Sequence, residues 1–80
     1  MIRRAEIDEE KLAEVALAVL SLTAHAEFGV TRAWKGLDWG LLETLHRKGW
    51  INDPVGKQKS VVFTAEGEKL AAEFLNRHFA

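Results

Sequence analysis

Residues 45–67 read LHRKGWINDPVGKQKSVVFTAEG, and a change of pattern inside this stretch decides the fold. Its first residues continue a helical spacing of apolar side chains up to Lys48, and Gly49 then stands where a helix often ends in a left-handed residue. Short apolar runs follow on either side of a tip made of Asn, Asp, Pro and Gly, which favour turns. We therefore predict a helix, a β-hairpin over residues 50–63, and another helix that begins after Thr64.

The N-terminal third of the chain predicts a long first helix. Asp8 is a good N-cap, and Glu9 and Glu10 place negative charge on the first turn. Apolar residues then recur at helical spacing from Leu12 to Ala26, over more than half of the helix circumference. A helix with so wide an apolar arc is expected to be either the spine of the fold or half of a dimer interface.

Two further helices are predicted from caps and spacing. Asp38 caps a helix over residues 39–48, whereas residues 28–37 read as a loop or a single irregular turn. The last helix carries Gly67 on its apolar side, although glycine costs about 1 kcal/mol relative to alanine inside a helix. We expect Gly67 to allow close backbone contact with a neighbouring helix. The chain is thus predicted to be an α+β protein, mostly helical, with three helices and one β-hairpin.

Residues 45–67 resemble the winged helix of MarR-type regulators. In that family a recognition helix ends in Lys, Gly, a hydrophobic residue and Ile, as residues 48–51 do here, and a wing leads through a strand and Leu-Thr-x-x-Gly into a C-terminal helix, as residues 63–67 do with Phe for Leu. The resemblance covers about the last half of the chain and implies a winged-helix-like domain, used for DNA association. Residues 28–37 are too short for a full helix ahead of the recognition helix, so the helix-turn-helix is expected to be reduced.

Two more strings carry a second resemblance. AWKG at 33–36 before Asp38-Trp39, and DPVGK at 53–57 before KSV at 59–61, resemble a family of short bacterial proteins known only as a domain of unknown function. This resemblance covers nearly the whole chain. It implies fold and size and brings no known activity.

Length and composition limit the class of protein. Eighty residues make one domain, 1–80, near the lower end of chains that fold without staples, and no cysteine is present for a disulfide or a thiolate metal site. No apolar run approaches the roughly 20 residues needed to span a bilayer, and the charged N-terminus lacks the pattern of a signal peptide. We therefore expect a cytoplasmic protein without membrane contact.

The net charge of −1 hides an uneven distribution. Residues 1–27 have three basic and six acidic side chains, a net −3, whereas residues 28–60 have six basic and three acidic ones, a net +3. A basic middle suits a polyanion, although this excess is modest beside that of typical nucleic-acid binders.

Basic side chains of this middle segment are the candidates for nucleic-acid contact. Lys57 and Lys59 at the hairpin would straddle a phosphate backbone or, alternatively, protect an exposed sheet edge against aggregation. The exposed face of the predicted recognition helix holds Arg47, which suits phosphate or guanine, and Glu43, which repels phosphate. Two alternatives stay open for this face: contact with nucleic acid, or a solvated or partner-facing surface. The full set of candidates is Arg32, Lys35, Arg47, Lys57 and Lys59.

Partner contacts are predicted from aromatic and aliphatic side chains. The tryptophans suit base stacking, but such residues are more often core or interface anchors. Trp50 opens a strand and is expected in the core, whereas Trp34 lies in the predicted loop and is our first candidate for a partner contact. Leu17 and Leu20 add a second apolar stripe to the first helix and are candidate contacts of a homodimer.

The sequence does not predict a catalytic or metal site. His25, His46 and His78 lack the short spacing of helical zinc motifs, and the two serines, Ser21 and Ser60, lack the pattern of a nucleophile with its base. We expect no enzyme activity, metal, cofactor or small-molecule substrate. Two functions remain open: a DNA-associated regulatory protein, dimeric through the first helix, or a protein-interaction or homodimerisation module without nucleic-acid binding.

Overall fold

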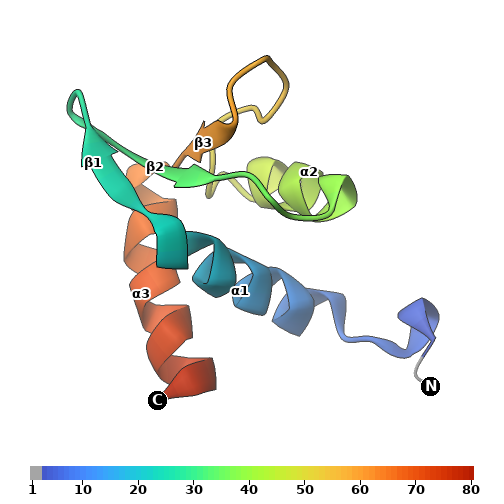
Figure 1. Ribbon diagram of the computed structural model, residues 1–80. Helices are drawn as coiled ribbons and strands as arrows, with labels where there is room; N and C mark the ends of the chain where they lie inside the picture. The colour runs from blue at the N-terminus through green and yellow to red at the C-terminus, as the bar shows by residue number, and fades with distance from the viewer. Residues whose placement is uncertain (1–2) are drawn as a thin grey trace.

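Each α-helix begins at a side chain that caps it. The computed structural model describes residues 3–80 (Figure 1). Asp8, Asp38 and Thr64 each accept a hydrogen bond from a backbone N–H in the first turn that follows. The helices that they start are α1 (Glu9–Leu20), α2 (Trp39–Arg47) and α3 (Ala65–Phe79). The three predicted caps are confirmed, because each cap needs only its own side chain and the next turn.

The first helix is shorter than predicted. A 3-10 helix, η1 (Arg4–Glu6), precedes α1, and α1 gives way to a second one, η2 (Ser21–Thr23), where the hydroxyl of Ser21 donates to the carbonyl of Ala18 at 2.6 Å. Hydroxyls that bond nearby carbonyls favour helix ends. The chain is extended from His25 onward, so the prediction that the helix reaches Ala26 was wrong.

The chain builds one antiparallel sheet of three strands. The strands are β1 (His25–Glu27), β2 (Val30–Trp34) and β3 (Ser60–Val62), in the order β1-β2-β3. Phe28 and Gly29 form the turn between β1 and β2 with positive φ angles of 50° and 81°. The prediction of a loop over residues 28–37 was therefore wrong, because β2 is the central strand of the sheet.

The predicted hairpin over residues 50–63 is present only in reduced form. Ile51 opposes Phe63 in a single antiparallel bridge, and the N–H of Asn52 donates to the carbonyl of Val62 at 2.8 Å. The main partner of β3 is β2, which the sequence did not predict. The class of the fold, α+β with three helices, is confirmed. The order helix, extended segment, loop, strand and helix is also present, but the winged-helix resemblance itself stays a prediction.

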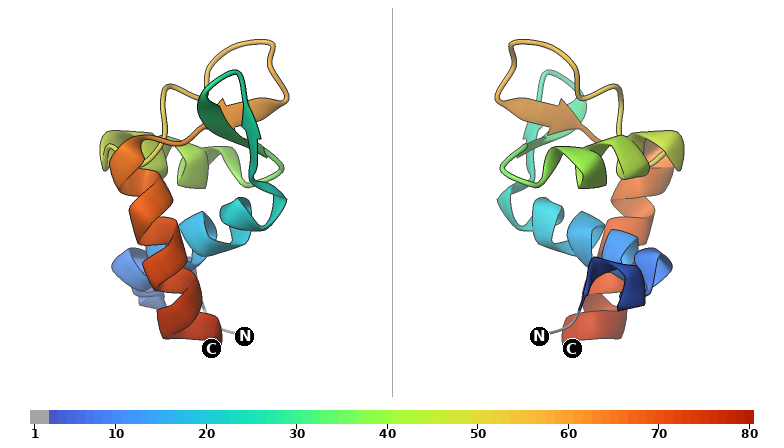
Figure 2. Two further views of the ribbon diagram at one scale, coloured as in Figure 1. Left: turned by 90° about the vertical axis from the view of Figure 1, so that its left-hand side faces the viewer. Right: turned by 90° about the vertical axis from the view of Figure 1, so that its right-hand side faces the viewer.

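The core lies where α1 meets the other elements. In Figures 1 and 2 the sheet and α2 lie on one side of α1, and α3 crosses α1. One cluster of buried side chains joins the elements, including Leu17 of α1, Leu45 of α2, Val61 of β3 and Phe74 of α3. None of the helices within residues 3–80 has both the length and the apolar character that a bilayer span requires.

The close approach predicted for Gly67 is present, but its partner is not a helix. A Cβ atom on Gly67 would overlap the backbone carbonyl oxygen of Trp50, which lies between α2 and the bridge at Ile51. The same carbonyl accepts from the N–H of Thr64 at 3.1 Å, and the Thr64 hydroxyl donates to the carbonyl of Gly49 at 2.6 Å. The start of α3 is thus fixed to the segment that leaves α2.

A polar cluster outside the core joins the middle of α1 to the last turn of α3. Glu14 of α1 accepts from Nε2 of His78 at 2.8 Å and from Nη1 of Arg77 at 2.9 Å. The hydrogen bond from His78 lowers the pKa of the Glu14 carboxyl below its ordinary value, with a smaller contribution from Arg77. Hydrogen bonds to the charged form of a carboxylate have this effect because they favour ionisation.

Replacement of Gly67 tests the junction with Trp50. We expect Gly67→Ala to lower the free energy of unfolding by about 3 kcal/mol, the upper part of the range for overpacking, because the obstacle is backbone. Urea denaturation followed by circular dichroism measures the change. Lys69→Ala, an exposed position of α3, is the control and should stay within about 0.5 kcal/mol of the wild type. Equal stability of the two variants would contradict the close approach.

Acid should weaken the contact between α1 and α3 through Glu14. Because the pKa of Glu14 is lowered in the folded chain, its stabilisation is fully present above the ordinary glutamate value of about 4.5 and is lost as the pH falls through the lower folded value. We expect Glu14→Gln to lose less stability than the wild type between pH 6 and pH 3. Urea midpoints at several pH values measure this, and parallel curves for the two proteins would refute it.

Candidate functional site

An apolar hollow opens where the end of α1 meets the segment between β2 and α2. It has a volume of about 250 Å³, and its lining is Val19, Leu20, Leu22, Thr23, Trp34, Gly36 and Leu37. Two of the side chains at its rim are well exposed, with exposed fractions of 70% for Leu22 and 62% for Trp34. Apolar side chains that gather at one exposed place are typical of a surface that binds another protein.

Local structure positions both rim side chains. The short helix η2 carries Leu22 out of the core, and the Oγ1 atom of Thr23 accepts from the backbone N–H of Trp34 at 3.0 Å. The indole of Trp34 lies against Gly36, where a Cβ atom would come within 2.8 Å of the ring. The end of β2 is therefore fixed beside η2, with the indole held over a glycine.

The three side chains predicted to contact a partner are divided by the structure. Trp34 is exposed and lines the apolar hollow. Leu17 and Leu20 are only 0% and 3% exposed, because α2, α3 and the sheet cover the apolar arc of α1. The prediction that Leu17 contacts a partner was therefore wrong, because α1 is the spine of the fold, and Leu20 reaches the surface only as part of the lining of the hollow. Leu22, two residues beyond α1, is the exposed leucine of this region.

The basic side chains near the sheet have structural partners. Arg32 lies on the outward face of β2 and donates to the hydroxyl of Ser60 at 3.1 Å. The Nζ atom of Lys35 donates to the carbonyls of Pro54 at 2.9 Å and Gly56 at 3.1 Å. Lys35 thus ties down the loop between the bridge and β3. This loop carries Lys57 and Lys59, which are both exposed.

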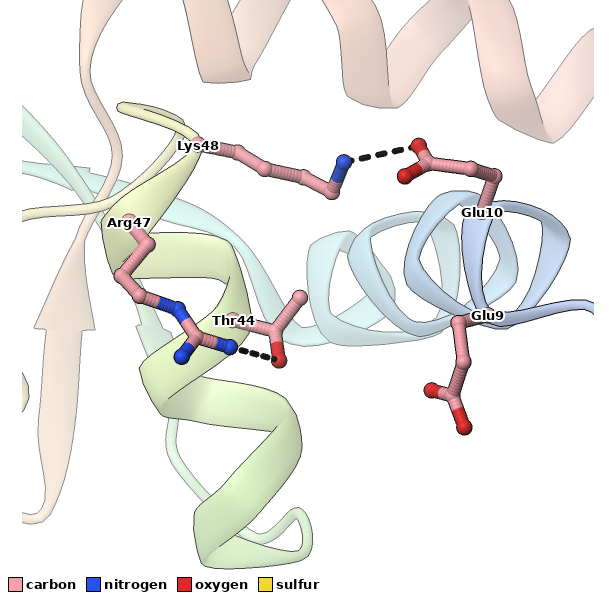
Figure 3. Close-up of a pocket in the computed structure, with 5 residues that line it drawn as sticks. All are labelled: Glu9, Glu10, Thr44, Arg47 and Lys48. Atoms are coloured by element: carbon pink, nitrogen blue, oxygen red, sulfur yellow. Dashed lines mark hydrogen bonds and ion pairs between the residues drawn. The ribbon is translucent and has the colours of Figure 1, made fainter. Parts of the chain in front are cut away.

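Arg47 lies in a different hollow, between the end of α2 and the start of α1 (Figure 3). Its guanidinium donates to the hydroxyl of Thr44 at 3.1 Å, and the neighbouring Lys48 forms an ion pair of 2.7 Å with Glu10. Glu9 also lines this hollow. The acidic first turn of α1 therefore offsets the positive charge at the end of α2, and the structure does not join Arg47 to the basic loop.

The exposed start of α2 offers little to a nucleic acid. Asp38 and Glu43 are both exposed and negative there, and Trp39 is half exposed. The N-terminal residues of a recognition helix are those that reach base edges, and negative side chains at that position repel phosphate. The helix resembles a recognition helix in sequence but lacks a basic exposed face at its N-terminal end.

The tip of the β1-β2 hairpin is a feature that sequence reasoning missed. Phe28 has an exposed fraction of 97% and a φ angle of 50°, a left-handed conformation that costs about 1 to 2 kcal/mol for a residue other than glycine. Val30, Glu27 and Arg32 line the same shallow hollow at the hairpin. The sequence signal for this hairpin was the pair Phe28-Gly29 between residues able to form strands. It was missed because Phe is not a usual first residue of a two-residue hairpin turn.

The remaining aromatic prediction concerns the core. Trp50 is buried as predicted, and its ring lies 5.3 Å from that of Phe74, centroid to centroid. Among the residues that the structure describes, no group of three or more His, Asp or Glu side chains is placed to hold a metal ion.

The comparisons with known proteins agree on a family without assigned activity. The model of a family described as a domain of unknown function, DUF6429, matches residues 8–80. Uncharacterized protein y4hR of Sinorhizobium fredii (strain NBRC 101917 / NGR234) is 47% identical over 74 residues, which cover 92% of this chain and 96% of that protein. No solved structure matches. The predicted resemblance to a bacterial family of unknown function is confirmed.

Proposed function

Because the chain belongs to the DUF6429 family, whose description names no activity, we propose a function from its surface: it is a protein-interaction module that binds a second copy of itself. The observation that carries the proposal is the apolar hollow with Leu22 and Trp34 exposed at its rim. Burial of a leucine side chain stabilises a complex by roughly 1.5 to 3 kcal/mol, and a tryptophan offers a still larger apolar area.

Two features favour a second copy over an unrelated partner. A chain of 80 residues buries a smaller fraction of its surface than a larger domain, and association is a common route by which small domains cover the remainder. In addition, Leu22 at the rim of the hollow lies three residues before the start of β1, which is an edge strand of the sheet. In an isologous interface the same surface of each copy contacts the other copy, so one apolar patch supplies both sides of the contact.

Substitution at the rim tests this proposal. We expect the wild type to sediment as a dimer at micromolar concentration, and we expect Leu22→Asp to weaken association by at least about tenfold, because a carboxylate would be buried in the contact. Val55→Asp is a matched control, since Val55 is 71% exposed, about as much as Leu22, but lies on the loop that precedes β3. A monomeric wild type, or equal weakening by both variants, would refute the proposal.

Nucleic-acid binding is the second candidate function, and one observation favours it. Arg32 and Trp34 lie on the same face of β2, because side chains two residues apart in a strand share a face, and β2 neighbours the loop that carries Lys57 and Lys59. Aromatic side chains stack on bases of single strands, and lysines contact phosphates without reading sequence. This candidate uses the sheet and the loop rather than α2.

Fluorescence anisotropy with labelled single-stranded and duplex oligonucleotides at low salt tests the second candidate. If it holds, single strands bind, and replacement of both Lys57 and Lys59 by Gln reduces the salt slope by about 1.4, or about 0.7 for each lost phosphate contact. Lys69→Gln on α3 is the control and leaves the slope unchanged. Arg47→Gln separates the two modes, since it weakens binding only if α2 contacts the nucleic acid. Absence of binding at low salt excludes this function.

A further inference from the structure

One edge of the sheet is the short strand β1, whereas at the other edge residues 51 and 52 pair with residues 62 and 63. The sheet order is β1-β2-β3, so within residues 3–80 no strand lies on the other side of β1. Figure 1 places β1 at the margin of the molecule, and the left view of Figure 2 looks onto this side. All three residues of β1 are exposed. An open strand edge is a template for pairing with another chain unless its side chains prevent it.

The hydrogen bonds of the sheet show which residue of β1 points its backbone N–H and C=O toward the open edge. The carbonyl of Thr31 accepts from the N–H of Phe63 at 2.9 Å, so the backbone of Thr31 faces β3. Thr31 is the cross-strand partner of Ala26. A backbone that faces β3 does not face β1, so Thr31 and Ala26 form a non-hydrogen-bonded pair. In such a pair the N–H and C=O of the two residues point away from each other, and those of Ala26 therefore face the open edge.

We infer that two copies of the chain pair antiparallel, edge to edge, through β1, about a two-fold axis at Ala26. This inference rests on the proposed function and names the contact that the second copy makes. Each Ala26 would donate its N–H to the C=O of the other Ala26 and accept in return, as in a hydrogen-bonded pair of an antiparallel sheet. The two three-stranded sheets would then form one sheet of six strands.

Hydrogen-bond complementarity between an imidazole and a carboxylate selects this partner and this register. The two-fold axis places His25 of each copy opposite Glu27 of the other, and these two side chains already form a hydrogen bond within one chain, with Nε2 to Oε2 at 3.2 Å. Both side chains lie on the same face of β1, because they are two residues apart. A shift of two residues along the strand would leave both pairs unmade, so the register at Ala26 is the one that satisfies all four side chains.

Apolar residues flank this pairing at both ends. The register brings the hairpin tip of one copy, with Phe28, beside Ala24 of the other copy, two residues from Leu22. Phe28 and Leu22 are among the most exposed apolar side chains of the described residues. The Phe28 rings of both copies would together offer roughly 300 to 500 Å² of apolar area, since a single aromatic side chain buries roughly 150 to 250 Å².

A cysteine at the axis tests the distance. The chain contains no cysteine, so Ala26→Cys introduces a single thiol. In a hydrogen-bonded antiparallel pair the Cα atoms lie about 5.5 Å apart, within the range that a disulfide accepts. We expect Ala26→Cys to form a disulfide-linked dimer in air, seen on a non-reducing gel, while the control Val55→Cys stays largely monomeric. Equal cross-linking of the two variants would overturn the pairing.

A charge exchange tests the register independently. Glu27→Lys places a lysine opposite His25 of the second copy, and His25→Glu places two glutamates opposite each other, so each variant alone should associate about tenfold more weakly than the wild type. An equimolar mixture should restore the dimer as a heterodimer, because the lysine introduced in one variant then faces the glutamate introduced in the other. Sedimentation measures association, and circular dichroism checks that each variant is folded.

The outcomes separate this inference from the proposed function. A wild-type dimer that is sensitive to Leu22→Asp, together with a mixture that does not restore association, leaves the proposed function standing and refutes pairing through β1. A monomeric wild type refutes both. Restored association in the mixture and cross-linking at residue 26 together support the edge-to-edge dimer.

Discussion

The backbone carbonyl of Trp50 is the point at which the parts of this fold meet. It accepts a hydrogen bond from Thr64 and lies so close to Gly67 that no larger residue fits there. The N–H of the same residue donates to Leu45 at the end of α2, and its ring packs on Phe74 of α3. One residue thus fixes the end of α2, the entry to the bridge at Ile51 and the direction of α3. Since β3 ends two residues before Thr64, the position of the sheet also depends on this junction.

Local features of the sequence predicted local features of the structure. Asp8, Asp38 and Thr64 act within one helical turn, and Gly49 has the expected positive φ of 79° because a helix end needs no distant partner. The strand β2 was missed for the opposite reason. Of its five residues only Ala33 is fully buried, and the turn before it begins with Phe28 in a conformation that phenylalanine rarely adopts. A strand of this kind is specified by its neighbours β1 and β3 rather than by its own hydrophobic pattern.

The arrangement of the candidate residues could be predicted only in part, because proximity in sequence is not proximity in space. The basic excess of residues 28–60 divides into a loop held by Lys35 and an end of α2 that faces the acidic start of α1. The candidate Trp34 is exposed at the end of β2, and its contact with a partner stays a prediction. Leu17 and Leu20 were predicted as contacts of a dimer because the apolar arc of α1 is wide for so small a chain. Three elements, α2, α3 and the sheet, cover this arc in the folded chain. What covers a helix depends on the tertiary arrangement, which periodicity alone does not contain.

An exposed strand edge normally carries charges that discourage pairing, and β1 does carry them. Lysines alone would repel every basic partner, including a second copy of the chain. An imidazole and a carboxylate two residues apart, His25 and Glu27, behave differently. They leave most registers of an arbitrary strand without matching partners, but they match their own sequence when it is reversed. In the proposed dimer, the same short edge would therefore both resist indiscriminate pairing and accept an identical strand. On this view the energetic cost of holding Phe28 in a left-handed turn is offset by contact in the dimer, because the ring has almost no contact within a single chain.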